Sequence, residues 1–211
     1  MHYTALVSGK SFANTYGKTG MLVLDIGGLN VNGSLREFFT NLGMKFVCID
    51  MEKHPSVDIV VQPGEKLPFE DGSVDLIVST SCFEHDPCFW LTFREMARIV
   101  KLGGFIYINA PSGGPYHKYP GDNWRFYSDA GQALAYWSGK QMFNETVYPT
   151  KVVETFNILG DPCDFNDFVC VWKRVEEKET EIIIQPNIEK TIGILEKMIN
   201  KEGLQTSKKK K

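Results

Sequence analysis

The chain has 211 residues, of which 43% are hydrophobic and 23% are charged, and its formal net charge is −3. These values fit one globular domain and exclude a largely disordered, collagen-like or coiled-coil chain, and the slight acidity argues against nucleic-acid binding as the main function. No apolar run approaches the roughly 18 residues of a membrane span, and the first residues lack the apolar stretch of a signal peptide. We therefore expect a cytoplasmic protein with no membrane span.

Residues 21–110 alternate strand-like apolar runs with helix-like segments. The expected strands lie, in chain order, at 21–26, 45–50, 57–61, 74–78 and 105–108. One helix is expected to begin at Ser34, where Ser34 and Glu37 have the spacing of a capping box, and to end at Gly43. Another is expected to begin at Asp86, because Pro87 follows it at the first helical position. This alternation predicts an α/β fold with a doubly wound, mainly parallel sheet.

The second half of the chain has a different composition. Residues 111–126 are rich in glycine, proline and aromatic side chains, and we expect them to form a loop over the carboxyl ends of the strands, where open α/β sheets bind ligands. A helix at 128–138 and a closing pair of strands at 151–159 and 165–172 follow. Residues 188–202 have an amphipathic helical pattern. We therefore expect one domain at 1–175 and a helical appendage with a basic tail at 176–211.

The cysteines and histidines show no metal-binding spacing. The five cysteines stand at positions 48, 82, 88, 163 and 170, without a C-x-x-C pair and without histidines at zinc-finger distances. We expect reduced thiols in or near the core and predict no metal-ligating residues, and the metal requirement stays open.

A glycine turn and two acids point to a nucleotide-like ligand. Asp25, Gly27 and Gly28 end the first strand and lead into a helix, and glycines there let a ligand approach the backbone. Asp50 ends the second strand, where an acid commonly accepts hydrogen bonds from ribose hydroxyls. The structural alternative is that both acids only cap turns.

Three further blocks make this pattern more specific. They read GEKLPFEDGSVD at 64–75, EHD at 84–86 and KLGG at 101–104. With these blocks, residues 22–108 resemble the class I S-adenosylmethionine-dependent methyltransferases, in their small-molecule branch. The resemblance implies a seven-stranded, Rossmann-like sheet with the last strand antiparallel. It also implies S-adenosylmethionine as the cofactor and S-adenosylhomocysteine as the product.

The resemblance also assigns cofactor contacts, with two departures from the family pattern. Leu29 and Val31 stand where the family has glycines, so that Asn30 or Asn32 would replace backbone contacts to the methionine end. Pro63 stands where relatives carry an acid, which leaves adenine recognition to backbone groups of 62–65 and to apolar stacking. The implied cofactor-binding residues are Asp25, Gly27, Gly28, Asn30, Asp50, Met51, Gln62, Gly64, Glu65, Ser79, Thr80 and Ser81.

Residues 28–34 and 109–127 resemble a subgroup found with polysaccharide and glycan assembly genes, which implies a sugar acceptor. A sugar hydroxyl is a poor nucleophile at neutral pH, so a general base would help. The candidate catalytic residues are His85, His117 and Asp122, with the alternative that His85 only orders the start of a helix.

The same loop carries candidate acceptor contacts. Tyr116, Tyr119 and Trp124 offer flat faces to a pyranose, and Arg125 could pair with a phosphate or carboxylate of the acceptor. The alternative is a packing wedge around Trp124, with Arg125 in a structural salt bridge.

The leading hypothesis is therefore a methyltransferase that O-methylates a sugar hydroxyl of a glycan or nucleotide-sugar. Alternatives are methylation of another small molecule at oxygen or nitrogen, and a non-catalytic subunit that keeps the cofactor fold. An NAD(P)-dependent oxidoreductase is disfavoured because the G-x-G-x-x-G spacing is not met. The expected partner is a small-molecule or glycan acceptor rather than a nucleic acid, and the oligomeric state stays open.

Overall fold

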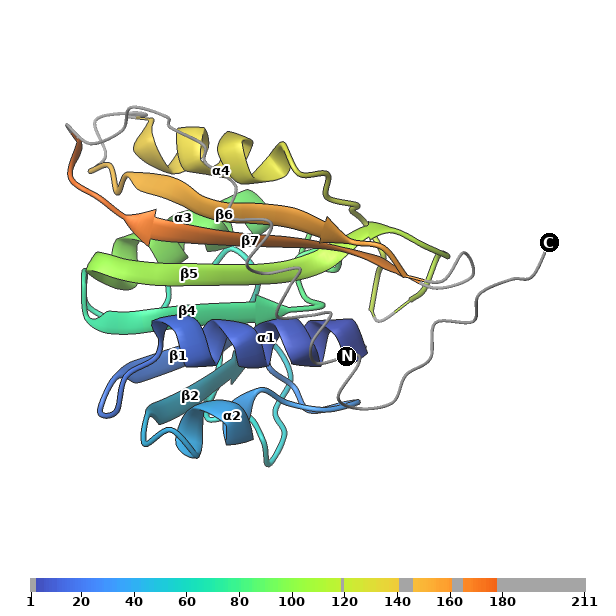
Figure 1. Cartoon of the computed structure of the whole chain (residues 1–211), viewed down its shortest axis with the longest axis horizontal. Coiled ribbons are helices and arrows are strands. Elements are labelled where there is room, and N and C mark those ends of the chain that lie inside the picture. Colours follow the sequence, from blue (N-terminus) through green and yellow to red (C-terminus); the bar gives the residue numbers. More distant parts are fainter. Residues whose placement is uncertain (1–2, 119, 141–145, 161–164, 178–211) are drawn as a thin grey trace.

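A seven-stranded sheet forms the centre of the part of the chain that the structure describes. The computed structural model describes residues 3–118, 120–140, 146–160 and 165–177. The strands are β1 (Leu22–Ile26), β2 (Lys45–Asp50), β3 (Ile59–Val60), β4 (Val74–Thr80), β5 (Val100–Gly113), β6 (Thr150–Ile158) and β7 (Asn166–Arg174). Their order is β3-β2-β1-β4-β5-β7-β6, with parallel pairs from β3 to β5 and with β7 antiparallel to both its neighbours (Figure 1). The predicted fold class is confirmed.

Within the described residues, four helices cover the two faces of this sheet. They are α1 (Tyr3–Tyr16), α2 (Arg36–Thr40), α3 (Phe89–Ile99) and α4 (Ala130–Gly139). α1 and α2 lie on one face, and α3 and α4 lie on the other (Figure 1). The alternation of side chains along a strand supplies both cores, because Leu76 and Val78 of β4 join the α1 side whereas Ile77 joins the α3 side.

Several local features differ from the sequence-based expectation. The sequence did not predict α1, α2 ends at Thr40 rather than at Gly43, and β5 begins at Val100 rather than at 105. β5 continues through Gly113, because residues 109–113 pair with β7, so the loop begins after Gly113 rather than at Pro111. The Ser34 hydroxyl accepts the amide of Arg36 at 3.1 Å, so the expected capping box with Glu37 is not formed. α3 begins later than expected, at Phe89, and the Asp86 carboxylate accepts the Cys88 amide one residue before it, at 2.8 Å.

Some expectations fall outside the described residues or are tested only in part. The predicted helix at 188–202, and with it the appendage at 176–211 beyond residue 177, lies outside the described residues, as do Tyr119 and Cys163. Four cysteines are free thiols, at positions 48, 82, 88 and 170. Within the described parts of the chain, no helix has the length and apolar character needed to cross a membrane.

Candidate functional site

A cavity of about 960 Å³ opens at the carboxyl ends of the parallel strands. Its walls come from the turn after β1, the end of β2, residues 61–65, the turn after β4 and residues 117–118, 120–121 and 123 of the loop. A cavity of this size is at the upper end of the range for small-molecule sites, so it has room for a cofactor and an acceptor side by side. The expected position of the 111–126 loop over the strand ends is thus confirmed for its middle part.

The glycine turn after β1 brings bare backbone to the cavity wall. Gly27 has a φ of +70°, and a Cβ at this position would lie 2.2 Å from the Cys82 sulfur. A Cβ on Gly28 would lie 2.5 Å from an Asp25 carboxylate oxygen. Both amides donate to the Ile49 carbonyl, at 2.8 and 3.2 Å. A side chain at either position would collide with these neighbours, and both glycines line the cavity, so the turn faces a ligand with backbone atoms alone.

Asp25 lies beneath this turn rather than in the cavity. It is 1% exposed, it does not line the cavity, and burial raises the pKa of its carboxyl to about 8. Ser79 is also buried away from the cavity, and its hydroxyl donates to the Ile26 carbonyl at 2.8 Å. Asn30 is exposed outside the cavity wall, whereas Asn32 lines it. Asp25, Asn30 and Ser79 therefore do not line the cavity, although the Asp25 carboxylate lies directly against Gly28, which does.

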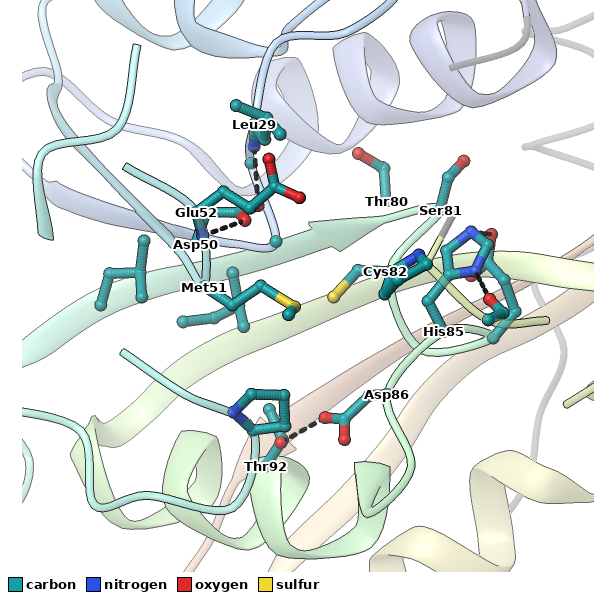
Figure 2. Close-up of a pocket in the computed structure, with 18 of the residues that line it drawn as sticks. Leu29, Asp50, Met51, Glu52, Thr80, Ser81, Cys82, His85, Asp86 and Thr92 are labelled. Atoms are coloured by element: carbon teal, nitrogen blue, oxygen red, sulfur yellow. Dashed lines mark hydrogen bonds and ion pairs between the residues drawn. The ribbon is translucent and has the colours of Figure 1, made fainter. Parts of the chain in front are cut away.

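Asp50 is held at the cavity wall by two backbone amides. One carboxylate oxygen accepts the amide of Leu29 at 3.1 Å, and the other accepts the amide of Glu52 at 3.1 Å (Figure 2). A carboxylate has about four lone-pair positions, so each oxygen keeps one position for a ligand hydroxyl. This geometry fits the predicted ribose contact.

The remaining predicted cofactor residues line the same cavity. They are Gly27, Gly28, Met51, Gln62, Gly64, Glu65, Thr80 and Ser81. The Glu65 carboxylate accepts the Gln62 amide at 3.0 Å, and the Gln62 side chain donates to the Met51 carbonyl at 3.1 Å. Ser81 has a φ of 50°, a left-handed conformation that is uncommon for a residue with a side chain and typical of functional turns.

The opposite end of the cavity carries an acid and two imidazoles. Glu84, His85 and His117 all line it, and the two histidine rings lie 4.9 Å apart, edge to face. His85 Nδ1 hydrogen-bonds to the Gly121 carbonyl, which leaves Nε2 facing the Glu84 carboxylate at 3.6 Å. Burial lowers the pKa of His85, so its ring is neutral near pH 7.

Asp122 positions other residues of the loop. Only 1% of its side chain is exposed, and it forms a two-point ion pair with Arg125. It also accepts the His117 amide at 2.8 Å. The hydrogen bond from Arg125 lowers the pKa of Asp122 to about 2, so this carboxylate is a weak base near neutral pH. Neither Asp122 nor Arg125 lines the cavity.

The predicted aromatic platform for a sugar is not assembled in the cavity by the described residues. The Trp124 indole donates to the Asp86 carbonyl at 2.9 Å, and its ring packs edge-on against Phe89 and Trp90. Tyr116 is 69% exposed and lies outside the cavity wall. The packing wedge considered in the sequence analysis describes Trp124 better than acceptor contact does.

Sequence reasoning gave no role to Glu84 and Asp167, which also line the cavity. Glu84 is 1% exposed, and burial raises its pKa to about 8. It stands in the EHD block, so the block itself was the available signal. Asp167 belongs to β7, which the sequence predicted only as one of the two closing strands.

Comparisons with known proteins agree with this geometry. Residues 24–108 match the family described as "Methyltransferase domain". An uncharacterized methyltransferase from Mycobacterium sp. (strain KMS) is 34% identical over 99 residues, which cover 43% of this chain and 38% of the relative. The chain thus spans about two fifths of the length of that relative.

Solved structures share the fold at low sequence identity. The Burkholderia thailandensis 1,6-didemethyltoxoflavin-N1-methyltransferase, with bound 1,6-didemethyltoxoflavin and S-adenosylhomocysteine, has a TM-score of 0.64 and 14% identity, covering 82% of this chain and 79% of that one. The [4+2]-cyclase SpnF has a TM-score of 0.59 and 12% identity, covering 81% and 80%. The matched segment, residues 24–108, is about two fifths of this chain; over that segment the chain is similar to a methyltransferase domain, and the solved structures show that it shares their fold.

Proposed function

We propose that this chain transfers the methyl group of S-adenosylmethionine to a hydroxyl of a small polar acceptor, namely a sugar hydroxyl of a glycan or nucleotide-sugar. One observation carries the proposal. A single cavity reaches from the carboxylate of Asp50 at one end to the imidazoles of His85 and His117 at the other. It therefore joins a donor end and an acceptor end.

The donor end has the features that S-adenosylmethionine requires. The Asp50 carboxylate, fixed by two amides, binds the ribose hydroxyls. Residues 62–65 line the place for the adenine, and the bare turn at Gly27 and Gly28 lies where the methionine part can approach the backbone. The Met51 and Cys82 side chains reach into the space between the two ends (Figure 2).

When bound, S-adenosylmethionine would supply a methyl group on a positively charged sulfur, and an acceptor oxygen can attack the methyl carbon with the sulfur as the leaving group. The chain then has to hold the acceptor oxygen in line with that methyl group and keep water away. The neutral ring of His85 has a lone pair at Nε2 that can accept the hydroxyl proton. Asp122 acts indirectly, by holding the His117 backbone in place.

The choice of a sugar hydroxyl rests on two supports. Residues 109–127 resemble a glycan-linked subgroup, and the acceptor end presents histidine and carboxylate groups that suit hydroxyl hydrogen bonds. Methylation at nitrogen is the second candidate, because the Burkholderia thailandensis neighbour is by name an N1-methyltransferase.

Titration calorimetry with S-adenosylhomocysteine and NAD(P), followed by mass spectrometry of methyl incorporation, tests the proposal. We expect binding of the sulfur ligand and a mass gain on a member of a panel of nucleotide-sugars and glycan fragments. Because the fold also occurs in a [4+2]-cyclase, the methylated product itself has to be detected. Binding of NAD(P) without any response to the sulfur ligand would contradict the proposal.

A further inference from the structure

We propose that Glu84, His85 and His117 together bind one divalent transition-metal ion at the acceptor end of the cavity. Each residue offers one ligand atom, and these atoms all lie within 4.8 Å of one another. All three residues line the cavity, so an ion held there is reachable by an acceptor.

The spacing of the ligand atoms is close to that of a coordination sphere. Bonds from zinc to histidine nitrogen or to carboxylate oxygen are about 2.0–2.2 Å long, so two ligands on opposite sides of an ion are about 4 Å apart. A group already confined within 4.8 Å reaches this arrangement through small rotations of the side chains.

The surrounding hydrogen bonds hold the three residues in place. His85 Nδ1 is bound to the Gly121 carbonyl, which directs the Nε2 lone pair toward Glu84. Such a bond from the second ring nitrogen is typical of metal-binding histidines. The Glu84 carbonyl accepts the amides of Asn123 and Trp124, at 2.8 and 3.2 Å, so the loop is fastened directly to the site.

A second support network fixes the other histidine. Asp122 accepts the His117 amide at 2.8 Å and lies 3.3 Å from its Nδ1. Arg125 holds Asp122 in turn through two contacts. The loop thus presents His117 to the cluster from a fixed backbone position.

The charge at the site is the strongest independent support. Glu84 is 1% exposed, and within the described residues its Oε2 has no hydrogen-bond partner. A buried carboxylate without a partner is costly, and a cation is one of the few groups that can stabilise its charged form.

The donor set favours one class of ion. Two imidazoles and one carboxylate suit Zn²⁺ and other transition metals, whereas Mg²⁺ and Ca²⁺ prefer sites built of oxygen atoms. Three protein ligands leave a position open, as in catalytic zinc sites. The open position would face the cavity that these residues line.

The role of the ion rests on the proposed function. An acceptor hydroxyl that binds the ion has a lower pKa and releases its proton to water. Its oxygen then forms the new bond to the methyl carbon, the carbon–sulfur bond breaks, and the electron pair stays on sulfur as the neutral thioether. In this arrangement the imidazoles serve as ligands, and the ion replaces them in promoting proton loss.

Direct metal binding by the full chain tests the site. We would strip the protein with a chelator and titrate it calorimetrically with Zn²⁺ or Co²⁺, with Mg²⁺ as the comparison ion. One equivalent of Zn²⁺ or Co²⁺ should bind, and Mg²⁺ should bind far more weakly. Glu84→Gln, which keeps the size of the side chain, and His117→Ala should each weaken binding by about 100-fold, and Asp122→Asn by about tenfold. His54→Ala, at an exposed histidine outside the cavity wall, should leave binding unchanged.

Two results would overturn the site. One is no binding of Zn²⁺ or Co²⁺ to the wild type, and the other is equal binding by the wild type, Glu84→Gln and His117→Ala. Circular dichroism of each variant shows whether it is folded, and Glu84→Gln keeps the test decisive if His117→Ala does not fold. Binding of S-adenosylhomocysteine is measured on the same samples. If S-adenosylhomocysteine binds but no metal binds, the metal site is wrong and the proposed function stands. If S-adenosylhomocysteine does not bind, the proposed function is contradicted, whatever the metal result.

Discussion

The buried carboxyl of Asp25 should make the stability of this protein depend on pH. Burial is the main cause that raises its pKa from 3.8 to about 8; the nearby Asp50 raises it further and Arg36 opposes the shift. Between these two values the unfolded chain has lost the proton that the folded chain keeps, so the free energy of unfolding falls as pH rises. The slope for one such group is about 1.4 kcal/mol per pH unit, or about 3 kcal/mol from pH 5 to pH 7.

Asp25→Asn removes this dependence while keeping a neutral group of the same shape. Urea unfolding of the wild type and the variant at pH 5, 6 and 7 measures the effect, and Asp129→Asn, at an exposed acid, is the matched control. Glu84 adds its own pH dependence to both proteins, so the difference between them isolates Asp25. Between pH 5 and pH 7, the free energy of unfolding of the wild type should fall by about 3 kcal/mol relative to that of Asp25→Asn. Parallel pH curves for the two proteins would refute the reasoning.

Three further predictions concern the site and its support. His117→Ala should slow methyl transfer by about 100-fold in the mass-spectrometric assay and should leave S-adenosylhomocysteine binding unchanged in calorimetry. A tenfold loss of S-adenosylhomocysteine binding would contradict the assignment of His117 to the acceptor end alone. Gly28→Ala should lower the free energy of unfolding by about 1–3 kcal/mol in urea unfolding, because the new Cβ would lie 2.5 Å from the Asp25 carboxylate. Gly139→Ala is the control and should be tolerated, because the nearest atom to its new Cβ is 3.9 Å away. Arg98→Met should cost about 1–3 kcal/mol by the same assay. The 7% exposed Arg98 side chain donates to two carboxylates and two backbone carbonyls, which lose this donor in the variant. An unchanged free energy of unfolding would contradict this account.

The sequence predicted those strands whose own residues are apolar enough to identify them. The apolar runs of β1, β2 and β4 are buried on both faces, so their sequences show them directly. α1 was missed because its burial depends on distant residues. Gly9 of α1 packs so closely on Leu35 that a Cβ there would lie 2.6 Å from that side chain, and Phe12 stacks near Tyr107 at 4.9 Å. The extension of β5 through Pro111 has a similar cause, since it follows from pairing with β7.

The sequence predicted a site residue correctly where the role of that residue follows from its position at the end of a strand. Asp50 ends β2 and faces the cavity as expected. Asp25 does not, because Leu24 and Ile26 on either side of it join the core on the α3 face and turn its side chain the opposite way. The environment of Glu84 was not predictable, because burial and the neighbouring carboxylates arise only in the folded chain. The same holds for the cluster with His117, which no sequence spacing could show.

Calorimetric titration of S-adenosylhomocysteine into the wild type, Asp50→Ala and Asp129→Ala tests most directly whether this cavity binds the donor through Asp50. We expect one equivalent to bind to the wild type and to Asp129→Ala with equal affinity. Asp50→Ala should bind about 10–100-fold more weakly, because it loses hydrogen bonds to a charged group. Equal affinity in Asp50→Ala, or no binding to the wild type, would contradict the account.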